Sequence, residues 1–172
     1  MPFRIVWFIA TLASLTCPAF AQEPEPVITL RRTACYGTCP VYSLEIFENG
    51  FIRYVGTDFV QSEGEHRTVI HHEAVENLIA LFLRSGYFSL KDDYETCRDA
   101  DGTTWFITDL PTTYTSLRIG TKKKSVRNYA CAPHPLIDLE HAIDKAANTQ
   151  RWIGDPSDHG PYGSSAIKAP KP

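Results

Sequence analysis

Cys35 and Cys39 lie near the start of the chain with three residues between them, and Cys97 and Cys131 follow later. Thiols at short spacing can form a structural disulfide, exchange disulfides with a substrate, or bind a metal ion. Which of these chemistries applies depends on the redox compartment and on the elements that position the thiols.

The start of the chain has the pattern of a secretory signal peptide over residues 1–21. Arg4 supplies the positive charge, an apolar run covers residues 5–15, and a small-x-small cleavage site ends at Ala21. The apolar run is shorter than the ~20 residues of a membrane-spanning helix, so we expect no membrane anchor after signal removal. We expect Cys17 to be removed with the leader, with a lipidated N-terminus at Cys17 as the alternative, and the expected location is periplasmic or extracellular. Four cysteines then remain, an even number that favours a disulfide framework.

The charge balance argues against one class of partner. Cleavage removes Arg4 from 17 basic residues and leaves all 20 acidic ones, so the net charge becomes 16 − 20 = −4. Nucleic-acid binding needs a clustered basic face, so we expect no nucleic acid as partner. The run of three lysines at residues 122–124 is interpreted as a solvated turn between strands, with contact to anionic lipid or polysaccharide as the alternative.

The mature chain is long enough for one domain with a core and too short for two of ordinary size. We expect a Pro/Glu linker at residues 22–26 and a single domain at residues 27–153. A disordered tail is expected at residues 154–172, which contain hardly any large apolar side chains.

Hydrophobic periodicity predicts the elements of this domain. The predicted strands cover residues 27–32, 41–47, 51–55, 67–71, 105–108, 115–119 and 125–129. One helix is predicted at residues 72–85, before Gly86. A second begins near Pro135, and its apolar positions are expected to face inward: Leu136, Leu139, Ile143 and Ala147. Trp152 is expected to cap the core. Strands grouped apart from helices predict an α+β fold: an antiparallel sheet built from hairpins, with two amphipathic helices packed on it.

The register of the first hairpin follows from side-chain pairing. A two-residue Asn-Gly loop would mix charged and apolar side chains across the ladder. A three-residue loop over residues 48–50 instead pairs Glu45 with Arg53 and places Gly50 where a left-handed conformation is needed. This register gives one apolar face, made of Tyr42, Leu44, Ile46, Ile52 and Tyr54.

A longer pattern begins at the first cysteine pair. It opens with Thr33-x-Cys35-x-Gly37-x-Cys39-Pro40-x-Tyr42 and continues with Asn49-Gly50 and Tyr54-x-Gly56. Phe88 and Leu90 follow the first helix, and the last part contains Thr108-Asp109, Tyr114, Pro135 and Trp152. In this pattern the chain resembles, over most of residues 27–153, a family of exported bacterial proteins named only as a domain of unknown function. The resemblance implies a small extracytoplasmic α+β domain with no assigned activity, cofactor or catalytic residue.

Four cysteines allow three disulfide connectivities. Cys97 and Cys131 are additions to the family pattern, so the resemblance favours their pairing with each other. An extended segment would hold Cys35 and Cys39 beyond disulfide reach, and Gly37 permits the chain to double back. Crossed pairings remain open at this point.

Thiol–disulfide exchange is the alternative chemistry for the first pair. Redox-active cysteines usually form C-x-x-C at a helix N-terminus, whereas Cys35 and Cys39 have three intervening residues and lead into a strand. We therefore interpret their bond as structural. A thiol-disulfide accessory protein acting through Cys35 and Cys39 is kept as the alternative function.

Metal and hydrolytic sites are not expected. His71 and His72 are neighbours at a strand-to-helix junction, where adjacent strand residues point to opposite faces. Residues 99–102 lack two ligands of a calcium-binding loop. The sequence contains no phosphate-binding glycine loop, nucleophile elbow or zinc-protease motif. We assign no catalytic residue, no cofactor and no metal.

Exposed aromatic side chains are the remaining candidates for recognition. Tyr36 lies inside the constrained loop, and Phe47 and Phe51 lie on the second face of the hairpin. These three residues form the candidate binding surface. We expect a non-enzymatic module that binds a protein or cell-envelope component.

Overall fold

A computed structural model describes residues 24–155 of the chain. The predicted signal peptide at residues 1–21, the start of the predicted linker and residues 156–172 of the predicted tail lie outside the described residues.

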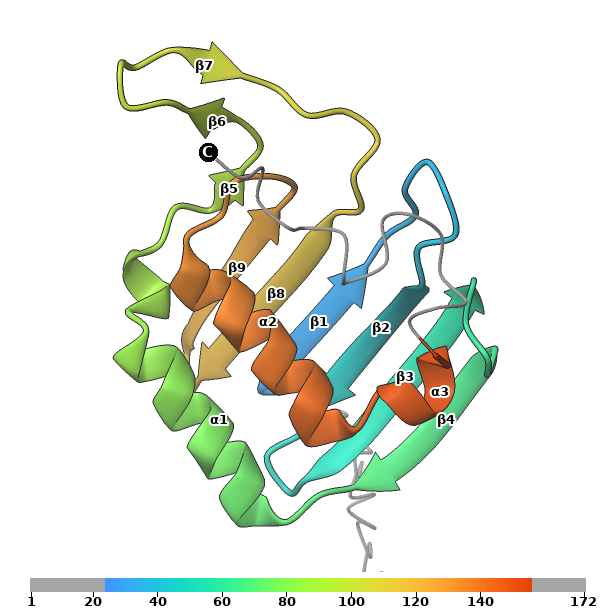
Figure 1. The fold of residues 1–172 in the computed structure, drawn as a ribbon. Coiled ribbons are helices and arrows are strands. Elements are labelled where there is room, and N and C mark those ends of the chain that lie inside the picture. Colours follow the sequence, from blue (N-terminus) through green and yellow to red (C-terminus); the bar gives the residue numbers. More distant parts are fainter. Residues whose placement is uncertain (1–23, 156–172) are drawn as a thin grey trace, which may run out of the picture.

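Seven strands form one sheet in the order β4-β3-β2-β1-β8-β9-β5 (Figure 1). Their bounds are β1 Ile28–Arg32, β2 Val41–Ile46, β3 Phe51–Asp58, β4 Gly64–Val69, β5 Asp93–Tyr94, β8 Thr113–Ile119 and β9 Lys122–Asn128. Neighbouring strands are antiparallel except β5 and β9, which are parallel. A separate pair of strands, β6 (Cys97–Arg98) and β7 (Thr104–Trp105), projects beyond β5. The predicted α+β class with a hairpin-built sheet is confirmed.

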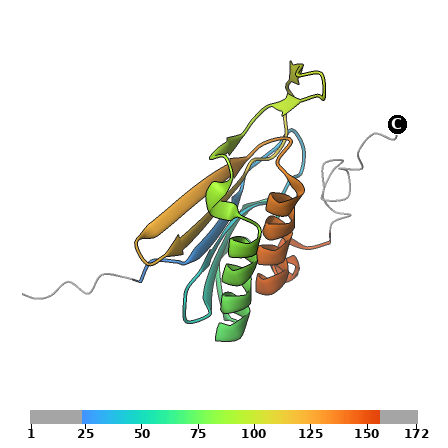
Figure 2. The same ribbon diagram turned by 90° about the vertical axis from the view of Figure 1, so that its left-hand side faces the viewer.

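The two predicted helices pack on the same face of the sheet (Figure 2). They are α1 (His72–Arg84) and α2 (His134–Ala147), and each agrees with its prediction within a residue at its N-terminus. Two short helical segments, η1 (Tyr87–Ser89) and α3 (Gln150–Ile153), follow them in the chain and were not predicted. Within residues 24–155, no helix combines the length and apolar character needed to cross a bilayer.

The core fills the space between the helices and one face of the sheet. It contains the predicted apolar face of the hairpin together with the predicted inward positions of α2, Leu136, Leu139, Ile143 and Ala147. Trp152 is 8% exposed and stacks on Tyr54, with ring centroids 4.7 Å apart, so it covers the core as predicted.

The predicted hairpin register is confirmed. Glu45 is opposite Arg53 and their side chains form an ion pair of 2.6 Å. Gly50 has φ +84°, the left-handed conformation that the three-residue loop requires.

The strand predicted at residues 105–108 is wrong. Only Thr104–Trp105 is a strand, and it pairs with Cys97–Arg98 outside the main sheet. A tight turn explains this pairing, because Asp99 and Thr103 form a backbone hydrogen bond of 2.9 Å that brings the two short strands together. Residues 106–112 then form a loop that leads to β8.

The lysine run is also placed differently from its prediction. Residues 122–124 are the first three residues of β9, and the turn before them lies at Gly120 and Thr121. Gly120 has φ +56°, a left-handed conformation that glycine adopts without strain. The lysines that follow the turn can therefore adopt the extended conformation of a strand.

Candidate functional site

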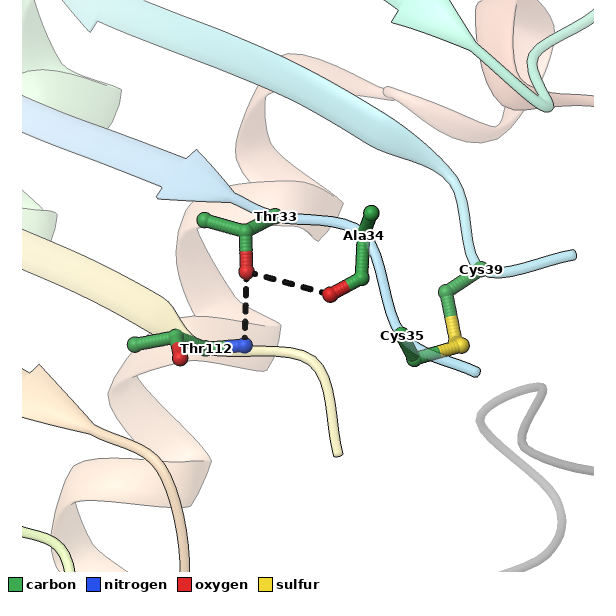
Figure 3. The surroundings of a disulfide bond; sticks show 5 residues. All are labelled: Thr33, Ala34, Cys35, Cys39 and Thr112. Atoms are coloured by element: carbon green, nitrogen blue, oxygen red, sulfur yellow. Dashed lines mark hydrogen bonds between the residues drawn. A yellow bond between two sulfur atoms is a disulfide. The ribbon is translucent and has the colours of Figure 1, made fainter. Parts of the chain in front are cut away.

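The motif loop, residues 33–40, joins β1 to β2 at the end of the sheet where β1 and β3 finish and β2 and β8 begin. We call this end the loop end. Cys35 and Cys39 form a disulfide with their Cα atoms 5.7 Å apart (Figure 3). Gly37 has φ +155°, and its N–H donates to the Cys35 carbonyl at 3.0 Å, so the chain doubles back at this glycine as predicted.

The second disulfide joins Cys97 and Cys131, whose Cα atoms lie 5.2 Å apart. It links β6 to the segment between β9 and α2, which also lies at the loop end. Both favoured pairings are therefore present, and the crossed connectivities are ruled out.

The motif loop is held against the segment that precedes β8. Thr33 exchanges two hydrogen bonds with Thr112: its N–H donates to the Thr112 carbonyl at 3.0 Å, and its Oγ1 accepts the Thr112 N–H at 2.9 Å. Figure 3 shows the second of these bonds beside the disulfide. The Tyr36 N–H donates to the Asp109 carbonyl at 3.1 Å. The two loops are thus fixed side by side by three backbone-anchored bonds.

The large apolar side chains exposed at the loop end are all aromatic. Tyr36 is 80% exposed and Phe106 is 70% exposed. Phe59, also exposed, directly follows the end of β3, and the exposed Trp105 belongs to β7, which projects at the same end of the molecule (Figure 1). Trp105 is oriented by a 2.9 Å hydrogen bond from its Nε1 to the Asp99 carboxylate. The other exposed large apolar side chains within residues 24–155 are aliphatic and lie elsewhere: Val69, Leu83 and Ile119.

The predicted binding surface is divided between two places. Phe47 and Phe51 lie together, with ring centroids 5.5 Å apart, at the turn that joins β2 to β3. Tyr36 lies beyond the other end of β2, and six extended residues separate the two places by roughly 20 Å. Tyr36 therefore belongs to the loop end, and Phe47 with Phe51 forms a separate aromatic pair.

A partly buried polar cluster lies directly beneath the loop end. The Arg32 guanidinium donates to the Tyr42 hydroxyl at 2.9 Å, to Thr113 Oγ1 at 3.0 Å and to Asp144 Oδ2 at 2.7 Å. The Tyr42 hydroxyl donates to Asp144 Oδ1 at 2.7 Å. The cluster joins β1, β2, β8 and α2 beside the motif loop.

Glu140 extends this cluster from one turn earlier on α2. Its Oε1 accepts a 2.8 Å hydrogen bond from Asn128, and its Oε2 lies 3.9 Å from Arg32. Burial raises the pKa of Glu140 to about 6, although Arg32 and Asn128 act in the opposite direction. Burial likewise raises the pKa of Tyr42. The three guanidinium nitrogens of Arg32 already have acceptors, so the cluster is arranged as internal support for the loop end.

Sequence reasoning missed this cluster. Ile28 and Leu30 alternate with outward residues, and the same period of two places Arg32 inward on β1. Glu140 and Asp144 are four residues apart and share a face of α2. The alternation on β1 and the four-residue spacing on α2 were the available signals. Neither pattern shows that Arg32 contacts the two carboxylates of α2.

Two buried tyrosines differ in how their hydroxyls are satisfied. The Tyr87 hydroxyl bonds to Thr115 Oγ1 at 2.9 Å. The Tyr54 hydroxyl is buried without a hydrogen-bond partner among the described residues. Burial, with a smaller contribution from Asp144, raises the pKa of Tyr54 to about 12, so the hydroxyl is neutral.

His66 on β4 and His72 at the start of α1 are used in local contacts. His72 Nδ1 is 2.8 Å from the Glu48 carbonyl oxygen, and His66 Nε2 is 3.1 Å from that of Glu63. Within residues 24–155, no three His, Cys, Asp or Glu side chains are grouped so that they could hold a metal ion.

A family model matches most of this chain. It is described as a domain of unknown function, DUF6438, and it matches residues 26–147, which contain the motif loop, the main sheet and α2. No curated protein matches the chain. The predicted resemblance to a domain-of-unknown-function family is confirmed, and export of the chain stays a prediction.

Proposed function

The chain belongs to the DUF6438 family of domains of unknown function, and we propose from its geometry that it is a non-enzymatic recognition module. In this proposal the module is exported to the periplasm or the medium. It binds a protein or a cell-envelope component through the aromatic side chains of the loop end.

The concentration of exposed aromatic side chains at the loop end carries this proposal. Tyr36 and Phe106 are the two most exposed of them, and they lie on loops joined by the hydrogen bond from Tyr36 to Asp109. Aromatic side chains contribute large contact areas with few rotatable bonds, and they are enriched among residues that dominate binding energy. The first disulfide closes the motif loop, and the second anchors β6, which pairs with β7 just before Phe106. Binding would therefore order little additional chain.

The proposed export is supported by the cysteines. Two disulfides in a small domain are typical of oxidising compartments and uncommon in reducing ones. Mass spectrometry of the protein recovered from cell fractions tests this part. We expect a chain that begins at Gln22 with four oxidised cysteines, and an intact leader with free thiols would contradict export.

A matched pair of double variants tests the binding surface. Tyr36→Ala with Phe106→Ala removes aromatic area at the loop end, and Val69→Ala with Leu83→Ala removes exposed apolar area elsewhere. Both proteins are immobilised and exposed to cell-envelope extract, and the captured components are compared with those of the unmodified domain. We expect capture to be lost only with the first pair. Equal capture by both variants would rule out the loop end as the contact surface.

Thiol–disulfide exchange through Cys35 and Cys39 is the alternative proposal, favoured by the exposed position of this loop. Cys39 is only 4% exposed, so Cys35 is the sulfur that an external thiol can approach. The pair lies in the loop between two strands, and within residues 24–155 no helix begins in that loop, whereas a helix N-terminus at the cysteines would lower a thiol pKa. Insulin reduction by the purified domain would support exchange, and a Cys35–Cys39 bond that resists mild dithiothreitol without insulin reduction would exclude it.

A further inference from the structure

Most of the outer edge of β9 is free. The sheet ends with β5, but β5 pairs only with Arg127 and Asn128. The preceding residues of β9 pair with β8 on one side and have no strand on the other within residues 24–155. A sheet edge of this kind presents backbone donors and acceptors to an incoming strand.

The hydrogen bonds at the end of β9 show which backbone groups point outward. The Arg127 N–H donates to the Asp92 carbonyl at 2.8 Å, on the side away from β8. The direction of the backbone N–H and C=O groups alternates from one strand residue to the next. Ser125 and Lys123 lie two and four residues before Arg127, so their N–H and C=O groups also point outward. The opposite strand agrees, since the N–H of Arg118, which faces Lys123, donates to Val27 on β1.

The free edge borders a shallow depression of about 360 Å³. Its lining consists of Phe88, Asp92, Lys122, Lys123, Lys124 and Ser125. Lys122 lies 4.0 Å from the ring centre of Phe88, and Lys124 forms an ion pair with Asp92. Lys123 points to the uncovered face of the sheet and has no ion pair within residues 24–155. The lining therefore carries three positive charges and one negative charge.

We propose that this edge binds an extended acidic peptide as an additional strand of the sheet. The backbone groups of Lys123 and Ser125 would form the ladder, and the lysines would contact carboxylates that alternate along the peptide. The same lysines repel a second copy of the edge, so the charge that favours an acidic strand opposes self-association. The opposite edge strand, β4, carries the ion-paired Glu65 and Arg67 and has no such excess of one sign.

A proline substitution separates strand addition from simple charge attraction. Ser125→Pro removes one outward N–H without a change in charge, and β8 does not use that N–H. Ser125→Ala is the matched control that keeps it. The probe is a labelled ten-residue peptide in which Glu alternates with Val and Thr, titrated by fluorescence anisotropy. We expect Ser125→Pro to weaken binding by about tenfold, as for a lost hydrogen bond, and Ser125→Ala to leave it unchanged.

Three further measurements make the outcome decisive. Amide hydrogen exchange of the unmodified domain should show new protection at Lys123 and Ser125 when the peptide binds. This measurement does not depend on the folding of a variant. Lys123→Glu leaves two positive and two negative charges in the lining, so it should abolish the preference for the Glu peptide over a peptide with Lys in place of Glu. Equal binding by Ser125→Pro and Ser125→Ala, with competition by polyphosphate, would reduce the edge to a general anion site and overturn the proposal. Concentration-dependent dimerisation through β9 without peptide binding would also overturn it.

Discussion

The ion pair of Arg32 and Asp144 connects residues that are 112 positions apart in the chain. Its side chains are only 23% and 20% exposed, so neither charge is well solvated without the other. Thr149 adds a 3.0 Å hydrogen bond to Asp144, which ties the segment before α3 to the same carboxylate. The position of the motif loop above α2 therefore depends on a small set of polar contacts.

Removal of the Asp144 carboxylate should destabilise the fold. Asp144→Ala leaves the partly buried guanidinium of Arg32 with only the more distant carboxylate of Glu140, 3.9 Å away. We expect the free energy of unfolding to fall by about 3 kcal/mol. Asp138→Ala, an exposed position of the same helix, is the control and should change it by less than about 0.5 kcal/mol. Urea unfolding measures both. Similar small changes in the two variants would show that the ion pair is not needed for stability.

The raised pKa of Glu140 predicts a pH dependence of stability. The native pKa of about 6 exceeds the ordinary value of 4.5 for a glutamate, so the native state binds the proton more tightly than the unfolded state. The contribution is therefore largest below pH 4.5 and is lost as the pH rises to about 6, by about 2 kcal/mol in total. Glu140→Gln cannot ionise, so the stability difference between variant and parent should change across this window. A constant difference would contradict the assignment.

The two buried tyrosines allow a paired test of hydroxyl satisfaction. Tyr54→Phe removes a hydroxyl that has no partner among the described residues, so we expect stability to increase by up to about 1 kcal/mol. Tyr87→Phe breaks the bond to Thr115 and should decrease stability by about 1 kcal/mol. Thermal unfolding of both variants gives the comparison. A loss in both would mean that the Tyr54 hydroxyl is bonded in solution.

At the residue scale, burial was predictable and pairing was not. The period of α2 placed Leu136 and Leu139 inward because apolar spacing is a property of one element. The contact between Arg32 and Asp144 depends on how β1 and α2 are placed across the core, which no local spacing encodes. Sequence analysis therefore identified the apolar core and overlooked the polar cluster inside it.

At the element scale, local pairing was predicted well and non-local pairing was not. The β2–β3 register follows from a three-residue turn, side-chain charge and one glycine, all within residues 41–58. The segment at residues 105–108 has strand-forming residues but lacks a partner in the main sheet. Its pairing with β6 depends on the turn at residues 99–103, a segment that was considered from the sequence only as an incomplete calcium-binding loop.

Gly50, the turn glycine of the β2–β3 hairpin, should tolerate no side chain. A Cβ atom on Gly50 would lie 2.1 Å from the Ile70 carbonyl oxygen, in addition to the strain of φ +84°. Gly64 has a similar φ of +82° but open space around it, so Gly64→Ala measures the strain alone. We expect Gly64→Ala to cost about 1 kcal/mol and Gly50→Ala at least about 3 kcal/mol. Equal losses in melting temperature would show that the backbone at Ile70 moves aside easily.

At the scale of the whole molecule, strand order was the part that sequence could not supply. β1 lies between β2, its neighbour in the chain, and β8, which is more than 80 residues away. This arrangement places the β1–β2 loop beside the segment before β8 and so creates the loop end. The predicted fold class was right because hairpins and helices are locally encoded, whereas the site depends on the closure of long loops.

The two disulfides should affect stability unequally, because the loops they close differ in length. In the chain-entropy model, a sequence separation of 34 corresponds to about 4 kcal/mol and a separation of 4 to about 2 kcal/mol. Replacement of both Cys97 and Cys131 by Ala should therefore lower the free energy of unfolding by about twice as much as replacement of Cys35 and Cys39. Guanidinium unfolding of the two double variants measures this ratio. A larger loss from the short bond would mean that the motif loop supports the core itself, through its contacts with Thr112 and Asp109, in addition to presenting Tyr36 at the surface.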